Sequence, residues 1–86
     1  MNEVIDEKVS VISKYDKTKG SFVPVKLQWQ GRVRVITKIG LHYTKREGRK
    51  LLHIFSVTDT HVCYYLSLDT ETLHWTLLEV SDGTTI

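Results

Sequence analysis

The feature that most constrains the fold of this chain is the alternation of apolar and polar residues with a period of two. Val25, Leu27 and Trp29, for example, are separated by lysine and glutamine, so they share one face of an extended strand. No window of ten residues carries apolar side chains at the spacing of a helix, and alanine, the residue with the highest helix propensity, is absent. The sequence therefore predicts an all-β fold.

The expected strands follow from where the alternation starts and stops. Gln30-Gly31 is typical of a tight hairpin turn, and Gly40 predicts a bend or bulge. The expected strands cover residues 8–15, 25–30, 32–39 with a continuation over 41–43, 51–57, 62–68 and 73–77. This pattern predicts a single antiparallel meander of five to six strands, either a curled sheet or a small barrel.

The orientation of two strand pairs decides the expected core. Over residues 32–39 we expect Val33 and Val35 to face inward and Arg34 to face solvent. If Thr70 and Glu71 form the tip of the last hairpin, Leu68 pairs with Leu73, Leu66 with Trp75 and Tyr64 with Leu77. The expected core cluster is Trp29, Val33, Val35, Tyr64, Leu66, Trp75 and Leu77.

The length and the single cysteine restrict the class of protein. Eighty-six residues predict one domain over 1–86, with frayed ends at 1–7 and 81–86. Cys63 has no partner for an internal disulfide, which indicates a reducing compartment. No run approaches the roughly 20 apolar residues that span a bilayer. We therefore expect a cytoplasmic protein with no membrane partner.

Charge is segregated along the sequence. Residues 26–50 contain eight basic residues and one acid, whereas residues 51–86 contain five acids and neither lysine nor arginine. A basic strip of this kind is typical of a surface that contacts phosphates or an acidic partner. Alternatively, the basic and acidic strands neutralise each other. The residues of the predicted surface for an anionic partner are Lys26, Gln28, Arg32, Arg34, Lys38, Tyr43, Lys45, Arg46, Arg49 and Lys50.

A second surface is predicted from apolar residues that do not fit the core face. Residues 51–57 are apolar on both faces, and the reverse side of the last two strands is also apolar. An apolar patch on so small a domain needs to be covered by a partner or by a second copy. The residues of this predicted apolar interface are Leu52, Ile54, Cys63, Tyr65, Leu78 and Val80.

Catalytic and metal signatures are weak. His61-x-Cys63 is the one close pair of metal-ligand residues, and it does not match the usual spacing of zinc sites. Cys63 lies in a strand among aromatic residues, away from the helix N-termini and electropositive clefts that activate catalytic thiols, and Asp69 and Glu71 are expected at an exposed hairpin tip. We expect no enzyme, no cofactor, no bound metal and no small-molecule substrate.

A family resemblance rests on two motifs. The first is Pro24-x-x-Leu27-x-Trp29-x-Gly31-Arg32, and the second is Tyr64-x-Leu66-x-x-Asp69-x-x-Thr72-x-x-Trp75-x-Leu77. Over residues 8–80 the chain resembles a family of small bacterial β-domains of uncharacterised function, some of which accompany translesion-polymerase genes. The resemblance implies a bacterial β-domain and no particular activity.

Two functions remain open at this stage. The first is a non-enzymatic binding or adaptor module that acts through protein–protein interaction or self-association, using the apolar interface. The alternative is a small β-barrel that binds single-stranded nucleic acid through the basic region of residues 26–50.

Overall fold

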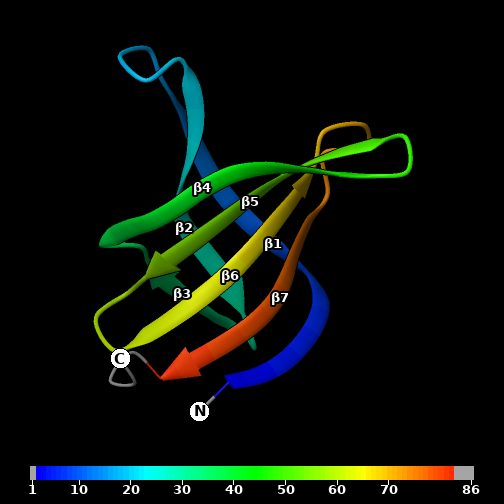
Figure 1. The fold of residues 1–86 in the computed structure, drawn as a ribbon. Helices are drawn as coiled ribbons and strands as arrows, with labels where there is room; N and C mark the ends of the chain where they lie inside the picture. Colours follow the sequence, from blue (N-terminus) through cyan, green and yellow to red (C-terminus); the bar gives the residue numbers. More distant parts are fainter. Residues whose placement is uncertain (1, 83–86) are drawn as a thin grey trace.

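The computed structural model describes residues 2–82, which form seven strands and no helix. The strands are β1 (Asn2–Asp16), β2 (Ser21–Trp29), β3 (Arg32–Val35), β4 (Lys38–Glu47), β5 (Lys50–Thr58), β6 (Val62–Asp69) and β7 (Trp75–Asp82). They form one antiparallel sheet in the order β3-β2-β1-β7-β6-β5-β4 (Figure 1). The predicted all-β antiparallel fold is confirmed, with seven strands instead of five or six.

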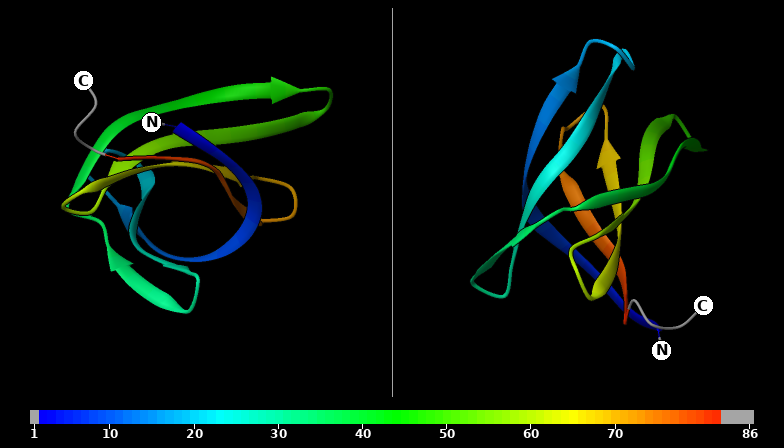
Figure 2. Two further views of the ribbon diagram at one scale, coloured as in Figure 1. Left: turned by 90° about the horizontal axis from the view of Figure 1, so that it is seen from below. Right: turned by 90° about the vertical axis from the view of Figure 1, so that its left-hand side faces the viewer.

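The additional strand arises at a corner in the chain. The strand expected over residues 32–39 is divided at Ile36 and Thr37. The Ile36 N–H donates to the Val25 carbonyl of β2 at 3.0 Å, and the Thr37 N–H donates to the Thr58 carbonyl of β5 at 2.8 Å. The chain therefore passes from one edge of the sheet to the other at this Ile36–Thr37 corner. The sheet curls strongly (Figure 2), but β3 and β4 do not pair and the barrel is not closed.

β1 connects the two parts of the curled sheet. Its first half pairs with β7 and its second half with β2. A register shift near Asp6, where φ is 52°, bends the strand between the two parts. The frayed ends predicted at 1–7 and 81–86 are wrong for 2–7 and 81–82, because these residues belong to β1 and β7. Residues 1 and 83–86 lie outside the described residues.

The core lies inside the curl. Its buried cluster is Leu27, Phe55, Val57, Tyr64, Leu66, Leu68, Trp75 and Leu77. Between β6 and β7, Leu68 pairs with Trp75 and Leu66 with Leu77, so the expected register is wrong by two residues on β7. The reason is a longer loop, in which Leu73 has a φ of 62° and lies exposed.

β3 is oriented opposite to the prediction. Val33 and Val35 are 62% and 56% exposed, whereas Arg34 is half-buried. The Arg34 guanidinium carbon lies 5.0 Å from the centre of the Trp29 ring, and Arg34 Nη1 donates to the Tyr64 hydroxyl at 3.0 Å. A cation over an aromatic ring and a hydrogen bond from a charged donor are each worth on the order of 1–2 kcal/mol or more when shielded from water. These contacts favour arginine inside at the expense of the two valines.

Two hairpins extend beyond the core. Residues 14–23 of the β1–β2 hairpin form the first arm, and residues 42–53 of the β4–β5 hairpin form the second arm. Both arms project away from the N-terminus, the first at the top of Figure 1 and the second to its right, and they diverge in the same way in Figure 2. We call the part of the molecule that carries both arms the two-armed end.

Candidate nucleic-acid interface

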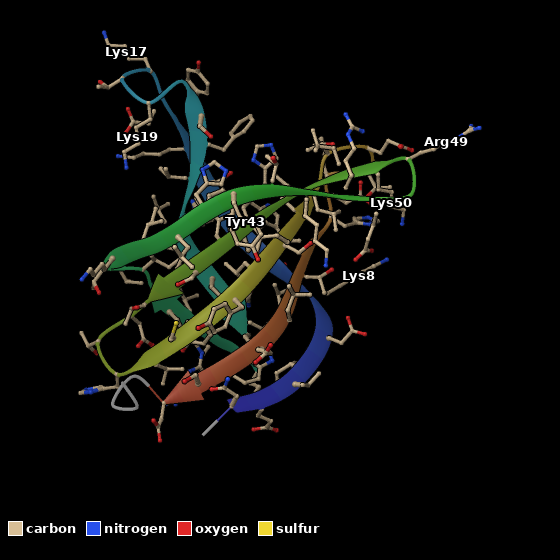
Figure 3. The ribbon with its side chains drawn as sticks, in the orientation of Figure 1. Lys8, Lys17, Lys19, Tyr43, Arg49 and Lys50 are labelled. Atoms are coloured by element: carbon tan, nitrogen blue, oxygen red, sulfur yellow. The ribbon has the colours of Figure 1, made fainter. Side chains whose placement is uncertain are left out.

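The first arm carries an exposed aromatic pair. Tyr15 and Phe22 are 61% and 51% exposed, and their rings meet edge to face with centroids 5.8 Å apart. The turn beyond them is fixed by Asp16, whose carboxylate accepts the Thr18 N–H at 2.9 Å. Two lysines at positions 17 and 19 extend from this tip (Figure 3). The arm thus presents rings and cations together.

The second arm carries a stack of rings that begins in the core. Phe55 packs against Trp75 with ring centroids 5.6 Å apart. The His42 ring lies on Phe55 at 4.2 Å with an angle of 10° between the planes, because these residues are opposite each other in the β4–β5 register. His42 Nε2 and His53 Nδ1 are 2.8 Å apart. Buried and exposed rings therefore form one continuous row.

The electrostatics of His42 connect the two arms. Partial burial lowers the pKa of His42 below 6.5, and electrostatic repulsion from the neighbouring His53 and Lys19 lowers it further. Lys19 belongs to the first arm, so its charge reaches an imidazole on the second arm. A groove lined by Lys19 of the first arm and by Lys38 and Ile39 of β4 shows that the first arm faces the strand that carries His42.

Two cations of the second arm form ion pairs, and several others on both arms form none within residues 2–82. Among residues 2–82, Lys45 pairs with Glu47 at 3.5 Å and Lys50 with Asp69 at 3.7 Å. Within the same described range, five further cations at this end make no ion pair: Lys14, Lys17, Lys19, Arg46 and Arg49. Lys14, Lys19 and Lys38 also line a groove between the first arm and the start of β4. The two-armed end is thus positively charged around its exposed rings.

The predicted surface for an anionic partner does not form one continuous face. Lys26, Gln28 and Arg32 are exposed on β2 and β3, and Lys38 begins β4 beyond the Ile36–Thr37 corner. The predicted outward orientation of Arg34 is wrong, as described above. The residues on the second arm, all exposed, are Tyr43, Lys45, Arg46, Arg49 and Lys50.

The predicted apolar interface is only partly placed together. Leu52, Ile54 and Leu78 line a groove on the outer face of the sheet, and Lys45, Lys50 and Asp69 border the same groove. Ile54 is only 6% exposed. Cys63 and Tyr65 are half-buried on β6. Val80, also predicted for this interface, is half-buried, pairs with Tyr64 and packs against the core.

Aromatic and charged residues also meet at the opposite end, which we call the Trp29 end. Tyr64 accepts a hydrogen bond from Arg34 and donates to Asp59 Oδ2 at 2.9 Å. Asp59 Oδ1 also accepts the N–H groups of His61 and Val62, both at 2.9 Å. The network joins β3, β6 and the β5–β6 turn across the unpaired edge of β3.

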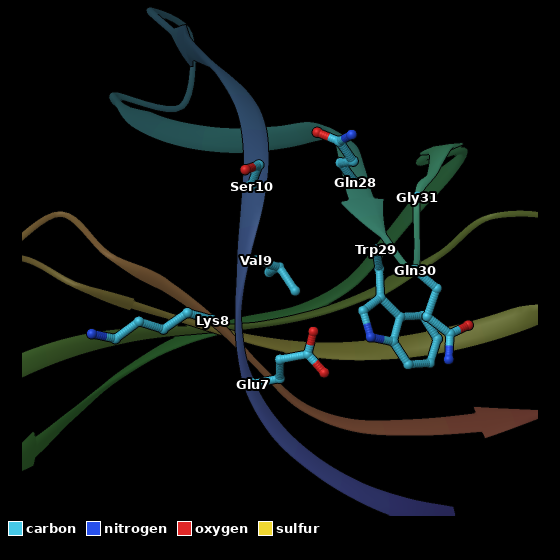
Figure 4. Close-up of a pocket in the computed structure, with 8 residues that line it drawn as sticks. All are labelled: Glu7, Lys8, Val9, Ser10, Gln28, Trp29, Gln30 and Gly31. Carbon is cyan, nitrogen blue, oxygen red and sulfur yellow. The ribbon is translucent and has the colours of Figure 1, made fainter.

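A pocket of about 330 Å³ opens beside Trp29 (Figure 4). Glu7 of β1 extends toward the indole from the opposite wall, whereas Lys8 points away. The indole Nε1 is buried and has no hydrogen-bond partner among the described residues. The walls of the pocket therefore carry the carboxylate of Glu7 and the buried N–H donor of Trp29. The pocket does not extend the basic surface of the two-armed end.

Sequence reasoning missed half of the two-armed end. Lys14, Lys17 and Lys19 precede the window of residues 26–50 in which basic residues were counted, and Asp16 interrupts them. A usable signal was present, because Tyr15 and Phe22 flank the polar turn at positions that pair across a hairpin. The contact between His42 and His53 could not be predicted without knowing the β4–β5 register.

Comparisons with protein-family models, curated proteins and solved structures find no match to this chain. In the part of the chain that the structure describes, no three histidine, cysteine, aspartate or glutamate residues gather as a metal site. Nor does a helix with the length and apolar character of a membrane span occur in residues 2–82.

Proposed function

We propose that this protein is a non-enzymatic binding module whose two-armed end binds single-stranded nucleic acid. The observation that carries the proposal is the row of rings from Trp75 through Phe55 to His42 and His53, on a hairpin that also carries exposed Arg46 and Arg49 and that the lysines of the first arm face across a groove. Proteins that bind single strands combine these two elements, a positive path for the backbone and aromatic faces for the bases.

The stacking contribution comes from rings that are already held in place. His42 is fixed from below by Phe55 and from the side by His53, so little side-chain entropy is lost when a base stacks on it. Tyr15 and Phe22 offer a second pair of rings on the first arm. Bases present such faces only when they are unpaired, which is why the proposal specifies a single strand.

The charge contribution is tested by a matched pair of triple variants. In the first variant, glutamine replaces three cations of the two-armed end: Lys17, Lys19 and Arg49. In the control variant, glutamine replaces three exposed cations elsewhere: Lys8, Lys26 and Arg32. Fluorescence anisotropy with a labelled single-stranded oligonucleotide measures affinity across a salt series. The first variant is expected to flatten the slope of log K against log salt by about 2, since each phosphate contributes roughly 0.7.

The control variant is expected to leave that slope nearly unchanged. Equal flattening in both variants would mean diffuse attraction without a site. No saturable binding near ~50 mM salt would remove the proposal altogether, because phosphate contacts are strongest at low salt.

The stacking contribution has its own matched pair. His42→Ala is expected to weaken binding by about 1–3 kcal/mol, the usual value for one base–aromatic stack. Tyr43→Ala is the control, because Tyr43 is also exposed but follows His42 on β4 and so lies on the other face of the strand. If the two variants lose equal affinity, the row of rings is not the stacking surface.

Protein binding is a second candidate function, consistent with an adaptor role. A specific observation favours it: the exposed Val33 and Val35 lie on β3, which is an edge strand of the sheet. Exposed β-branched residues on an edge strand are typical of sites that accept another strand.

A further inference from the structure

The unpaired edge of β3 borders an open gap. β3 pairs only with β2, and the neighbour expected in a closed barrel, β4, turns away at the Ile36–Thr37 corner. A gap of about 400 Å³ remains, lined by all four residues of β3 together with Thr37, Asp59 and Thr60. This volume accommodates a few residues of extended chain alongside β3.

The backbone of β3 alternates between its two sides. The β2–β3 turn consists of two residues, and the Ile36 N–H donates to β2. Since backbone groups alternate along a strand, Arg32 and Arg34 also direct their N–H and C=O groups toward β2. Val33 and Val35 consequently direct theirs toward the gap, where β3 has no neighbouring strand.

The charge in the gap favours an acidic ligand. Arg32 and Arg34 outnumber Asp59, whose carboxylate is already bonded to two N–H groups and to the Tyr64 hydroxyl. A guanidinium group has five N–H donors, and the interaction found for Arg34 uses Nη1, while its Nε is buried without a partner. A carboxylate beside Arg34 would therefore meet a cation with free donors.

We propose that β3 binds an extended acidic peptide from a partner protein, which adds to the sheet as an antiparallel eighth strand. Two apolar residues of the peptide lie beside Val33 and Val35 on the outer face, and the acidic residue between them lies beside Arg34 on the inner face. The recognised pattern is apolar–acidic–apolar, and main-chain hydrogen bonds to Val33 and Val35 supply the register. This site is separate from the two-armed end and does not depend on nucleic-acid binding.

The experiment uses synthetic peptides and the full chain labelled with ¹⁵N. A short acetylated and amidated peptide with the central sequence Val-Glu-Val is titrated, and amide shifts are followed by NMR. We expect saturable shifts at the Val33 and Val35 amides and none in the two arms. A Val-Lys-Val peptide of equal length is the matched control and is expected to bind about tenfold more weakly, because it places a second cation beside Arg34.

The hydrogen-bond register is tested on the peptide itself. N-methylation of either valine removes a donor aimed at β3 and is expected to abolish the shifts. N-methylation of the glutamate is expected to leave binding intact, because its N–H points away from β3. Val33→Pro in the protein removes the free-edge donor without breaking a bond to β2, whereas Val33→Thr keeps that donor.

Several outcomes would overturn the proposal. These are equal binding of the glutamate and lysine peptides, equal tolerance of N-methylation at all three positions, or shifts confined to the arms. The N-methyl series is measured on the unaltered protein, so it decides the matter even if the proline variant does not fold.

Discussion

The two ends of this molecule contain the same kinds of residue and use them differently. At the Trp29 end, Arg34 lies over an indole and bonds to Tyr64, which in turn bonds to Asp59. At the two-armed end, Lys17, Lys19, Arg46 and Arg49 are exposed and make no ion pair within residues 2–82. Cations at the first end hold strands together, whereas cations at the second end are available to a ligand.

The difference follows from where each cation stands in the sheet. Arg34 is on the inner face of an edge strand, so its side chain crosses to β6 and fastens an edge that has no neighbouring strand. Arg46 pairs with Leu51 near the end of the β4–β5 hairpin, Arg49 lies in its turn, and both residues are exposed. Equal charges thus stabilise the fold at one end and leave it nearly unaffected at the other.

The largest expected effect compares one arginine from each end. Arg34→Ala removes a stacked cation and a charged hydrogen bond, so it should lower the free energy of unfolding by about 2–4 kcal/mol. Arg46→Ala, on the exposed arm, should change it by less than about 0.5 kcal/mol. Urea denaturation of both variants measures the two values. Similar losses in both variants would contradict the assignment of different roles to the two ends.

The fold class and the β2–β3 turn were predictable because they depend on local patterns. Gln30 and Gly31 adopt φ values of 54° and 71°, as the Gln-Gly turn predicts. Gly40 marks a register shift between Ile39 and Leu41, and a Cβ there would lie 2.9 Å from Ser56 Oγ. Each of these features is encoded by a few adjacent residues.

The orientation of β3 was not predictable from its own residues. Arginine and valine alternate in this strand, so either face satisfies a period of two. Hydrophobicity alone favours valine inside, but the choice is made by Trp29 and by Tyr64, which is 30 residues further along the chain. A contact of that range needs the whole sheet to be known.

The candidate site was half predictable for a similar reason. Arg46 and Arg49 follow from the local excess of basic residues, and the structure places them on an arm. The first arm escaped notice because its lysines are separated in sequence from the second arm. Nothing local indicates that Lys19 shares a groove with the start of β4, the strand that carries His42.

The second prediction concerns the middle of the Trp29 network. Tyr64→Phe keeps the buried ring but removes the hydroxyl that accepts from Arg34 and donates to Asp59. The loss should be about 1–3 kcal/mol, because a charged donor and a charged acceptor each lose a partner. Tyr43→Phe on the exposed second arm is the control, and thermal unfolding should distinguish it from Tyr64→Phe. An unchanged melting temperature in Tyr64→Phe would show that the network does not fasten β3.

The smallest expected effect is on the pH dependence of stability, which differs between the two ends. Burial alone would raise the pKa of Asp59, but hydrogen bonds from His61, Val62 and Tyr64 outweigh it and the pKa lies below 3.8. The folded state therefore holds the Asp59 proton less tightly than the unfolded state. Asp59 contributes stability above pH 3.8 that is lost as the pH falls through its folded pKa.

His42 acts in a higher pH range. Its pKa is lowered from 6.5, so between 6.5 and the folded pKa the unfolded state binds more protons than the folded state. Stability should therefore fall as the pH decreases from 6.5, before Asp59 begins to titrate. His42→Asn should remove the loss that begins near pH 6.5. Asp59→Asn should reduce the loss below 3.8 while lowering stability at neutral pH; the loss that remains is expected from Asp69, whose pKa the Glu71 N–H also lowers.

The two pH ranges can be measured on one set of samples. Urea midpoints of the unaltered protein, His42→Asn and Asp59→Asn are recorded from pH 8 to 3, with His74→Asn as the control because His74 is an exposed histidine of the β6–β7 loop that takes no part in the row of rings. The midpoint of the unaltered protein should decline in two separate steps, because the two groups belong to different ends and titrate independently. If His42→Asn and His74→Asn give the same profile, the His42 ring is not held against Phe55 and His53 as a neutral group. The different roles assigned to the Trp29 end and the two-armed end would then be supported by Arg34 alone.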